Sequence, residues 1–501
     1  MKYPVFIWMI PLLLIASPLI YLVGRIESRM VNTGKKIRFA PYLALVPLLT
    51  AWVIYGFAIQ SFNLSGATTF LFEAIWLQVD GISLLLAAIV LGLGSLVVLY
   101  SIPYMAGEPG EEKYYAMLLA MLGVMIGLGC TRDLFNLWVW FEAMAVSSYL
   151  LVAFYRNQPE SLESGIKYLV QSATGSVLVL LGIGLVLSQT GTLDLAKITE
   201  SAQPTPLLAA AGVLFLVGFG VKIALVPLHT WLPDAHSQAP SGISAMLSGV
   251  VIETGLIALL RVLSALNNVA SWGLLLAGFG ALNMLYGNLL ALKQTHVKRL
   301  LAFSSLSHMG YILLGFGFAI DSGLFLGAQG AFFHIINHGV MKGLAFLAAG
   351  VFIYIEHHHT GIQSPLLIKD LSGMAKQYPI PALALSLAVL GLGGLPPLAG
   401  FMSKWQIFLA GFEIQSGWAI GLVIFAALNS VLSLAYYAPL VNTLYRQTPS
   451  TPEREKIILP VAIVIPLVIF SLLVIIFGLL PGLMDWLTYP AAQALVMGLA
   501  K

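Results

Sequence analysis

The chain has 501 residues, of which 59% are hydrophobic and 9% are charged, and its formal net charge at pH 7 is +3. Soluble globular domains carry about 25% charged residues, so this composition excludes a single aqueous core and requires lipid as the solvent. The small, scattered positive charge excludes a basic surface for nucleic acid, and the one cysteine, Cys130, excludes an iron–sulfur cluster or a disulfide framework built from this chain alone.

Apolar runs occupy most of the chain. A membrane span needs about 20 mostly apolar residues, so we expect an all-α polytopic membrane protein with about fourteen transmembrane helices. The first run is long enough to span and lacks a convincing cleavage motif, so we interpret it as a retained helix. We expect the short apolar tail 486–500 to be interfacial. The predicted spans are 4–24, 39–61, 81–104, 114–130, 134–154, 165–189, 206–226, 239–264, 270–292, 299–320, 326–355, 379–411, 416–444 and 458–481.

Lysine and arginine residues between the spans predict the orientation, because they favour cytoplasmic loops. Sixteen of them lie in alternate loops, beginning with the loop after the first span. Four lie on the opposite side: Lys2, Arg132, Lys197 and Lys501. This asymmetry places both termini outside the cytoplasm and predicts an even number of spans.

Two spans are interrupted, the seventh by Pro227 and the twelfth by Pro396 and Pro397. Proline removes a backbone donor, and such breaks survive in a bilayer only where protein or a wet cavity satisfies the freed groups. Paired broken helices point to the ion pathway of a transporter. Their offset of five spans predicts two inverted five-helix repeats. We therefore expect helices 1–3 in residues 1–113, the repeats in 114–265 and 266–445, and helix 14 with the tail in 446–501.

Five charged residues lie inside the apolar runs, although a charge at the bilayer centre costs roughly 2.5–3.5 kcal/mol. Glu142, flanked by aromatic residues, needs a proton or a cationic partner. Lys222, next to the first break, can exchange such a partner and so load and release a proton. Lys404, next to the second break, is a candidate terminal relay group facing an aqueous exit. The alternatives are an interfacial acid and two lysines that snorkel to the membrane surface.

Glu253 lies in the middle of the eighth span, and Arg261 follows two helical turns later. We interpret Glu253 as a further proton-relay group. The alternative is a structural glutamate that pairs with Arg261 or with a neighbouring subunit.

Histidines add a second set of candidate relay residues. One helix face carries three of them at i, i+4 and i+8: His334, His338 and the fifth charged residue, Lys342. His308 lies in the preceding span. Histidine passes protons between its two nitrogens near neutral pH. A zinc site is disfavoured because no Glu follows His334 as in the metalloprotease motif and no third ligand has suitable spacing. Each histidine taken alone could be a hydrogen-bonded core residue.

The remaining polar positions have simpler interpretations. We expect His357, His358 and His359 to lie in a solvated loop. Asp80, before the third span, and Asp234 with His236, after the seventh, are expected to shape loops or helix caps. No Gly-rich phosphate loop follows a strand, and no cofactor ligand set is present, so we expect neither a nucleotide site nor a redox reaction on this chain.

Residues 227–240, PLHTWLPDAHSQAP, resemble the signature of the antiporter-like membrane subunits of respiratory complex I. The same family includes the large subunits of Mrp sodium/proton antiporters and of energy-converting membrane hydrogenases. Further matches are KRLLAFSS at 298–305 with His308, the face with His334, His338 and Lys342, and GLPP at 394–397 with Lys404. The resemblance covers most of the chain, is strong from about Asp80 to Lys404, and is closest to complex I subunit M and its counterpart in Mrp antiporters.

The resemblance implies fourteen helices, two inverted repeats and proton translocation driven by a neighbouring redox or ion-coupled module. The partners would be other membrane subunits, in a bacterial or archaeal plasma membrane or an organelle inner or thylakoid membrane. By position, Glu142 matches the fifth-helix glutamate, Lys222 the seventh-helix lysine and Lys404 the twelfth-helix lysine or glutamate. Many members have lysine in the eighth helix, where this chain has Glu253.

Our hypothesis is that Glu253 relays protons as a carboxyl group between Lys222 and the histidine region. Buried lysines and histidines favour protons over Na⁺. A NADH- or ferredoxin:quinone oxidoreductase, a Mrp antiporter and a membrane hydrogenase all fit as parent complex. A stand-alone secondary transporter and a scaffold with a degenerate channel are the competing interpretations.

Overall fold

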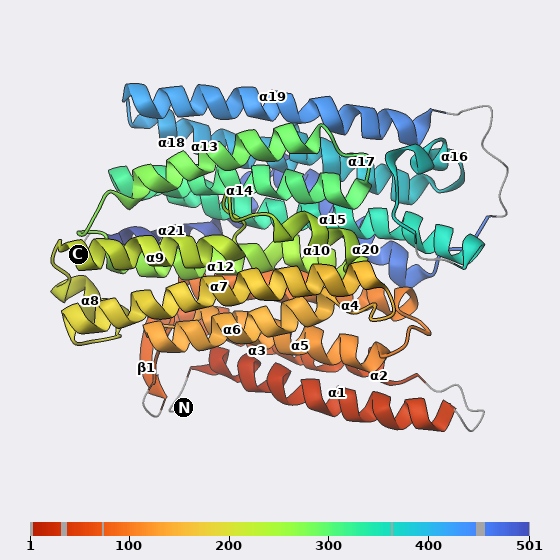
Figure 1. Ribbon diagram of the computed structural model, residues 1–501, viewed down its shortest axis with the longest axis horizontal. Coiled ribbons are helices and arrows are strands. Elements are labelled where there is room, and N and C mark those ends of the chain that lie inside the picture. Colours follow the sequence, from red (N-terminus) through yellow and green to blue (C-terminus); the bar gives the residue numbers. More distant parts are fainter. Residues whose placement is uncertain (1–3, 32–37, 73–74, 362–363, 447–455, 500–501) are drawn as a thin grey trace. The chain divides into compact units, whose positions relative to one another are not determined.

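The computed structural model describes residues 4–31, 38–72, 75–361, 364–446 and 456–499, whose regular secondary structure is helical apart from one β-hairpin (Figure 1). The predicted all-α membrane fold is confirmed. Within these residues, 12 helices are long and apolar enough to cross a membrane. The interrupted spans contribute two shorter apolar helices, Pro206–Lys222 and Pro379–Gly393. The count of fourteen spans stays a prediction.

The chain divides into two compact units. The first comprises Met1–Ile223, Val250–Ala270 and Tyr489–Lys501, and the second comprises Ala224–Gly249 and Ser271–Thr488. Residues 224–249, which the sequence analysis assigns to the first repeat, group with the second unit. The predicted repeat boundaries at 114–265 and 266–445 stay a prediction.

The first unit contains the β-hairpin, which the sequence analysis did not predict. Its strands pair antiparallel from Thr68 with Val79 to Phe72 with Ile75. The elements of this unit are η1 (Val5–Trp8), α1 (Met9–Val31), α2 (Ala40–Leu43), α3 (Leu45–Ser65), β1 (Thr68–Phe72), β2 (Ile75–Val79), α4 (Gly81–Tyr104), α5 (Glu111–Gly129), α6 (Leu134–Val152), α7 (Pro159–Thr190), α8 (Leu195–Ser201), α9 (Pro206–Lys222) and α12 (Ile252–Ala265).

The second unit holds most of the remaining helices. They are α10 (Trp231–Gln238), α11 (Ser241–Met246), α13 (Trp272–Ala291), α14 (Val297–Ser322), α15 (Phe325–Thr360), η3 (Ile368–Leu371), α16 (Met374–Gln377), α17 (Pro379–Gly393), α18 (Ala399–Glu413), α19 (Gly417–Tyr445), α20 (Val461–Leu479) and η4 (Pro481–Met484). A short π-helix, η2 (Leu247–Val251), leads into α12, and α21 (Asp485–Leu499) covers the tail that we expected to be interfacial.

Acidic side chains begin several helices, as the cap interpretation of Asp80 predicts. Asp80 forms a capping box with Ser83 at the start of α4. Asp133 and Asp194 accept backbone hydrogen bonds at the starts of α6 and α8. Such caps satisfy the amide groups that a helix leaves unpaired at its N-terminus.

The prediction of a loop at His357, His358 and His359 is wrong. These residues form the last turn of α15, which continues to Thr360 and ends where Gly361 adopts a φ of +69°. Glycine accepts this left-handed conformation without strain and so ends the helix.

Helices α13 and α14 pack through glycine. A Cβ atom placed on Gly280 would lie 2.7 Å from the carbonyl oxygen of Gly310, and one placed on Gly310 would lie 2.5 Å from that of Gly280. Small residues of this kind let helix backbones approach closely within a membrane. This contact fixes α14, the helix that carries His308.

Candidate functional site

The first helix interruption lies where the sequence predicts it. Helix α9 ends at Lys222, α10 begins at Trp231, and the Val226–Pro227 peptide between them is cis. Asn283 of α13 binds two buried backbone groups of the break: its side-chain amide accepts from the nitrogen of Val226 at 2.9 Å and donates to the carbonyl oxygen of Ala224 at 3.3 Å. The sequence analysis missed Asn283, since an asparagine in an apolar run gives no signal of its partner.

Lys222 is the central charged group of the first unit. It is 1% exposed, and its Nζ atom donates a hydrogen bond to the Tyr168 hydroxyl at 2.5 Å and lies 4.6 Å from the centroid of that ring. Within the described residues, no carboxylate forms an ion pair with Lys222 within 4.0 Å. Its direct contacts are therefore the hydroxyl and the aromatic face of Tyr168, a partner that the sequence did not reveal.

Glu142 of α6 lies near enough to act electrostatically on Lys222 without a direct bridge. The residue is half-buried, and its Oε1 atom is buried without a hydrogen-bond partner among the described residues. Buried polar atoms are normally satisfied by protein or by ordered water.

Glu253 is fully buried as the second residue of α12, directly after the π-helix η2. Gly255, two residues after Glu253, faces the side chain of Lys222, since a Cβ atom on Gly255 would lie 3.1 Å from Cγ of Lys222. The segment that carries Glu253 therefore packs against the end of α9. π-Helical turns are frequent at functional sites, where they change the direction in which side chains point.

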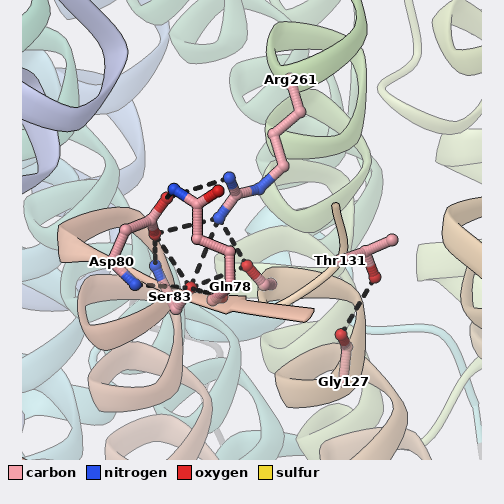
Figure 2. Close-up of polar contacts among 7 residues, drawn as sticks. Gln78, Asp80, Ser83, Gly127, Thr131 and Arg261 are labelled. Atoms are coloured by element: carbon pink, nitrogen blue, oxygen red, sulfur yellow. Dashed lines mark hydrogen bonds and ion pairs between the residues drawn. The ribbon is translucent and has the colours of Figure 1, made fainter. Parts of the chain in front are cut away.

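Arg261, the suggested structural partner of Glu253, binds Asp80 instead (Figure 2). Its two terminal nitrogens each lie 3.0 Å from an Asp80 carboxylate oxygen, and Nη2 also donates to the carbonyl oxygen of Gly129 at 2.6 Å. Gln78 and Ser83 complete the cluster around the carboxylate. The alternative in which Glu253 pairs with Arg261 is thus not formed.

In the second unit, the predicted histidines form a connected row. Nδ1 of His308 lies 3.1 Å from Nε2 of His334, and Nδ1 of His334 lies 2.8 Å from Oγ of Ser403. The His338 ring stacks on His308 with centroids 5.3 Å apart. All three imidazoles are buried, and Tyr311 connects the row to Lys404, because its ring centroid lies 6.0 Å from that of His334 and 4.5 Å from Nζ of Lys404.

Lys342, also fully buried, is held by groups of α14. Its Nζ atom donates to the carbonyl oxygen of Leu301 at 2.8 Å and to the Ser304 hydroxyl at 2.5 Å. Ser304 in turn bonds the Tyr437 hydroxyl. Both groups that hold the Lys342 ammonium are therefore neutral.

The second interruption separates α17 from α18, and the Pro396–Pro397 peptide within it is cis. Lys404 is 2% exposed and binds this break directly, donating to the carbonyl oxygen of Leu392 and to the Ser430 hydroxyl, each at 2.9 Å. Its Nζ atom also lies 4.5 Å from the ring centroid of Tyr311. The carbonyl end of a half-helix is a favourable place for a cation.

The buried charges that the structure describes in the second unit are all of one sign. Among its described residues no Asp or Glu is buried, whereas Lys298, Lys342 and Lys404 are. Several uncompensated ammonium groups in one interior are costly. The arrangement therefore suits groups whose protonation changes during function. No cluster of three potential metal-binding side chains occurs among the described residues.

Comparison with known families matches residues 131–430 to the model described as NADH:quinone oxidoreductase/Mrp antiporter, transmembrane. Residues 74–115 match the complex I chain 5 N-terminus. The chain is 33% identical over 430 residues to F(420)H(2) dehydrogenase subunit N of Methanosarcina mazei, covering 84% of this chain and 85% of that protein. It is 30% identical over 485 residues to NADH-quinone oxidoreductase subunit N of Heliobacterium modesticaldum, covering 94% and 96%.

One Na(+)/H(+) antiporter protein of Alkalihalophilus pseudofirmus is 31% identical over 444 residues, covering 83% of this chain and 54% of that protein. Among solved structures, a chain of the membrane-bound sulfane sulfur reductase, an archaeal respiratory membrane complex, superposes with a TM-score of 0.86 at 28% identity, covering 99% and 98%. A chain of Thermus thermophilus respiratory complex I gives a TM-score of 0.75 at 28% identity, covering 95% of this chain and 98% of that chain.

The particular likeness to complex I subunit M and its Mrp counterpart stays a prediction. The chain belongs to the family of antiporter-like membrane subunits shared by NADH:quinone oxidoreductases and Mrp antiporters.

Proposed function

We propose that this chain is a proton-translocating subunit of a multisubunit membrane complex, in which buried Glu, Lys and His residues move H⁺ under the control of a redox or ion-driven partner module. One observation carries the proposal. Each unit places a buried lysine at the edge of a helix interruption, Lys222 at the first and Lys404 at the second, and neutral groups hold the ammonium of each.

A lysine in this position can be held in either of two protonation states. When protonated, it is stabilised by hydroxyl and carbonyl dipoles and by an aromatic face; when neutral, it avoids the cost of a buried charge. In the first unit the nearby Glu142 shifts this balance, so a change in the position of Glu142 would load or release the proton of Lys222. In the second unit the row from His308 through His334 to Ser403 offers a hydrogen-bonded path toward Lys404.

The loop contacts support the predicted orientation. In the first unit, the loops after the predicted second, fourth and sixth spans lie together, since Leu77 bridges Thr131 and Asp133 bridges Asp194. Loops two spans apart meet only if each intervening pair of helices crosses the membrane and returns. With the Lys and Arg asymmetry, these contacts favour both termini on the non-cytoplasmic side.

The same pattern holds in the second unit. His296 bridges Leu367, and the nitrogen of Gly373 donates to the carbonyl oxygen of Thr443 at 3.2 Å. These residues belong to the loops or helix ends after the predicted ninth, eleventh and thirteenth spans. The interrupted α17–α18 segment therefore behaves as one crossing, which supports the expected fourteen spans.

Na⁺/H⁺ exchange in a Mrp-type assembly is a second candidate, because of the similarity to the Alkalihalophilus pseudofirmus antiporter protein. The groups at the two interruptions favour H⁺ as the ion carried here, since protonated Lys and His donate hydrogen bonds and offer no oxygen ligands for Na⁺. Membrane-hydrogenase membership and a scaffold role are the remaining alternatives. The proteins that copurify with the tagged chain identify the parent complex.

The test is proton uptake by the purified complex reconstituted in liposomes, followed with a pH-sensitive dye while the complex is driven by its own reaction. We expect Lys222→Ala and Lys404→Ala each to lower proton uptake by about tenfold or more, because each removes the group that carries the proton. Lys293→Ala, which changes an exposed lysine, is the matched control. Normal uptake by both buried-lysine variants in an assembled complex would leave the scaffold interpretation in place.

Glu253→Gln tests the least usual member of the relay. The amide keeps the approximate size of the side chain and still forms hydrogen bonds, but it neither gains nor loses a proton near pH 7. We expect the complex to assemble and its proton uptake to fall. Unchanged uptake would remove Glu253 from the relay while leaving the roles of the two lysines open to their own test.

A further inference from the structure

The ion pair between Asp80 and Arg261 lies at the end of the first unit where strand β2 leads into α4 and where α5 ends (Figure 2). Arg261 reaches it from α12, the helix that also carries Glu253. The side chain of Arg261 is 9% exposed and that of Asp80 is 3% exposed. Apolar side chains of similar volume would stabilise such packing as well or better, so these buried charges call for a functional explanation.

The helix period places Arg261 in line with the proposed relay. Glu253, Ile257 and Arg261 recur at i, i+4 and i+8 and so share one face of α12. Arg261 lies about 12 Å further along the helix axis than Glu253. One apolar turn, that of Ile257, separates the two along this face. A proton that leaves Glu253 along α12 toward the β2 end of the unit would therefore meet Arg261.

Neither member of the ion pair can pass that proton on. The guanidinium of Arg261 has donors but no acceptor, and it stays protonated in proteins. The two Asp80 carboxylate oxygens accept from four N–H groups: the Ser83 nitrogen at 2.9 Å, Nη1 and Nη2 of Arg261 at 3.0 Å each, and Nε2 of Gln78 at 3.2 Å. A carboxylate has about four lone-pair sites, so these groups occupy all of them. Protonation of Asp80 would also leave the Arg261 charge buried without its partner.

Polar atoms continue on the far side of the guanidinium. Ser264 lies one turn beyond Arg261 on α12, and its hydroxyl is buried without a hydrogen-bond partner among the described residues, as is Nε of Arg261. Buried polar atoms of this kind are normally satisfied by ordered water. A fixed cation repels protons that water would otherwise conduct, as arginine does in pores that exclude protons.

We propose that Arg261, held in place by Asp80, is the barrier that keeps protons on Glu253 and Lys222 from escaping through the β2 end of the first unit. The inference rests on the proposed function, since such a barrier matters only where protons are carried. Asp80 is a positioning residue, because it fixes the guanidinium through two hydrogen bonds at 3.0 Å. Without this barrier, the first unit would dissipate the proton gradient that the complex builds.

The test measures passive proton leak into liposomes that hold the assembled complex, with no driving reaction and with a potassium diffusion potential set by valinomycin. A pH-sensitive dye inside the vesicles reports the leak. Arg261→Ala removes the guanidinium and leaves room for water, and Arg261→Gln frees a lone pair of Asp80 while nearly filling the site. We expect both variants to raise the leak rate by about tenfold or more. Driven proton uptake should fall while the driving reaction keeps its rate.

Two controls separate loss of a barrier from loss of packing. Leu260→Ala changes the buried neighbour of Arg261 and leaves an apolar cavity, which stays dry, so its vesicles should be as tight as those with the wild type. Lys222→Ala added to Arg261→Ala should abolish the leak, because it removes the group that supplies the protons. A leak that came from a generally loosened structure would not depend on Lys222.

The inference is overturned if either Arg261 variant is as tight as the wild type, or if the leak persists without Lys222. These outcomes are distinct from failure of the proposed function. If the wild-type complex takes up no protons when driven, the proposed function itself fails. If the wild type pumps and the Arg261 variants do not leak, only the barrier role of Arg261 is wrong.

Discussion

The ion pair between Asp80 and Arg261 offers the sharpest test of the packing in the first unit. The two side chains are 3% and 9% exposed, and the pair is bidentate with both nitrogen–oxygen distances at 3.0 Å. Removing one partner of a buried pair costs about 3–5 kcal/mol, because the other charge is left uncompensated. Asp80 also caps α4, which adds about 1 kcal/mol.

These two contributions can be separated by substitution. Asp80→Asn keeps a good capping residue and removes the charge, so we expect it to cost about 3 kcal/mol or more. At about 2 °C per kcal/mol, this corresponds to a fall in apparent melting temperature of about 6 °C. Asp80→Ala removes the cap as well and should cost about 2 °C more.

The assay heats the detergent-solubilised complex carrying a fluorescent tag on this chain and follows loss of its size-exclusion peak. The double variant Asp80→Asn with Arg261→Gln leaves no uncompensated charge, so its loss should be smaller than the sum of the single losses by about 1 kcal/mol or more. The reasoning is refuted if Asp80→Asn shifts the melting temperature by less than about 1 °C, or if the single losses add.

Two further predictions concern contacts of single residues. Tyr168→Phe keeps the ring beside Lys222 but removes the hydroxyl that accepts the lysine's hydrogen bond. We expect an assembled complex whose proton uptake falls several-fold. Unchanged uptake would mean that the ring alone stabilises the lysine. Gly280→Val places a side chain against the Gly310 carbonyl and should lower the free energy of unfolding by about 1–3 kcal/mol, with a lower melting temperature and a lower yield. Gly278→Val is the control, because a Cβ atom there has nothing within 4 Å, and it should behave like the wild type in the same melting assay.

The helix pattern and the interruptions could be predicted from the sequence because each has a direct chemical signature. Long apolar runs mark helices in lipid, and Pro227, Pro396 and Pro397 lie where the structure breaks α9 from α10 and α17 from α18. The face of α15 that carries His334 and Lys342 follows from the helical period alone.

The partners of these residues could not be predicted, because they come from other helices. Tyr168 beside Lys222, Asn283 across the first break and Ser430 beside Lys404 are ordinary polar residues whose importance appears only when the helices pack. The β-hairpin was missed because its strands, rich in aromatic residues, lie between two spans where a loop is the default expectation. The sequence offered Arg261 as a partner of Glu253 only as an alternative, and its actual partner, Asp80, could not be predicted because spacing along one helix says nothing about a residue 181 positions away.

Both units hold a buried lysine at a helix interruption, but the charged groups around the two lysines differ. In the first, a half-buried acid, Glu142, acts on Lys222, so the cost of a protonated lysine depends on where that acid lies. In the second, Lys342 and Lys404 share an interior in which no described acid is buried, so each added proton raises the cost of the next. In the proposed function, a proton on Lys342 therefore disfavours protonation of Lys404, and release from one favours loading of the other. An arrangement that lowered this mutual repulsion, such as Ser304→Asp beside Lys342, would be expected to hold the proton in place and to slow its passage.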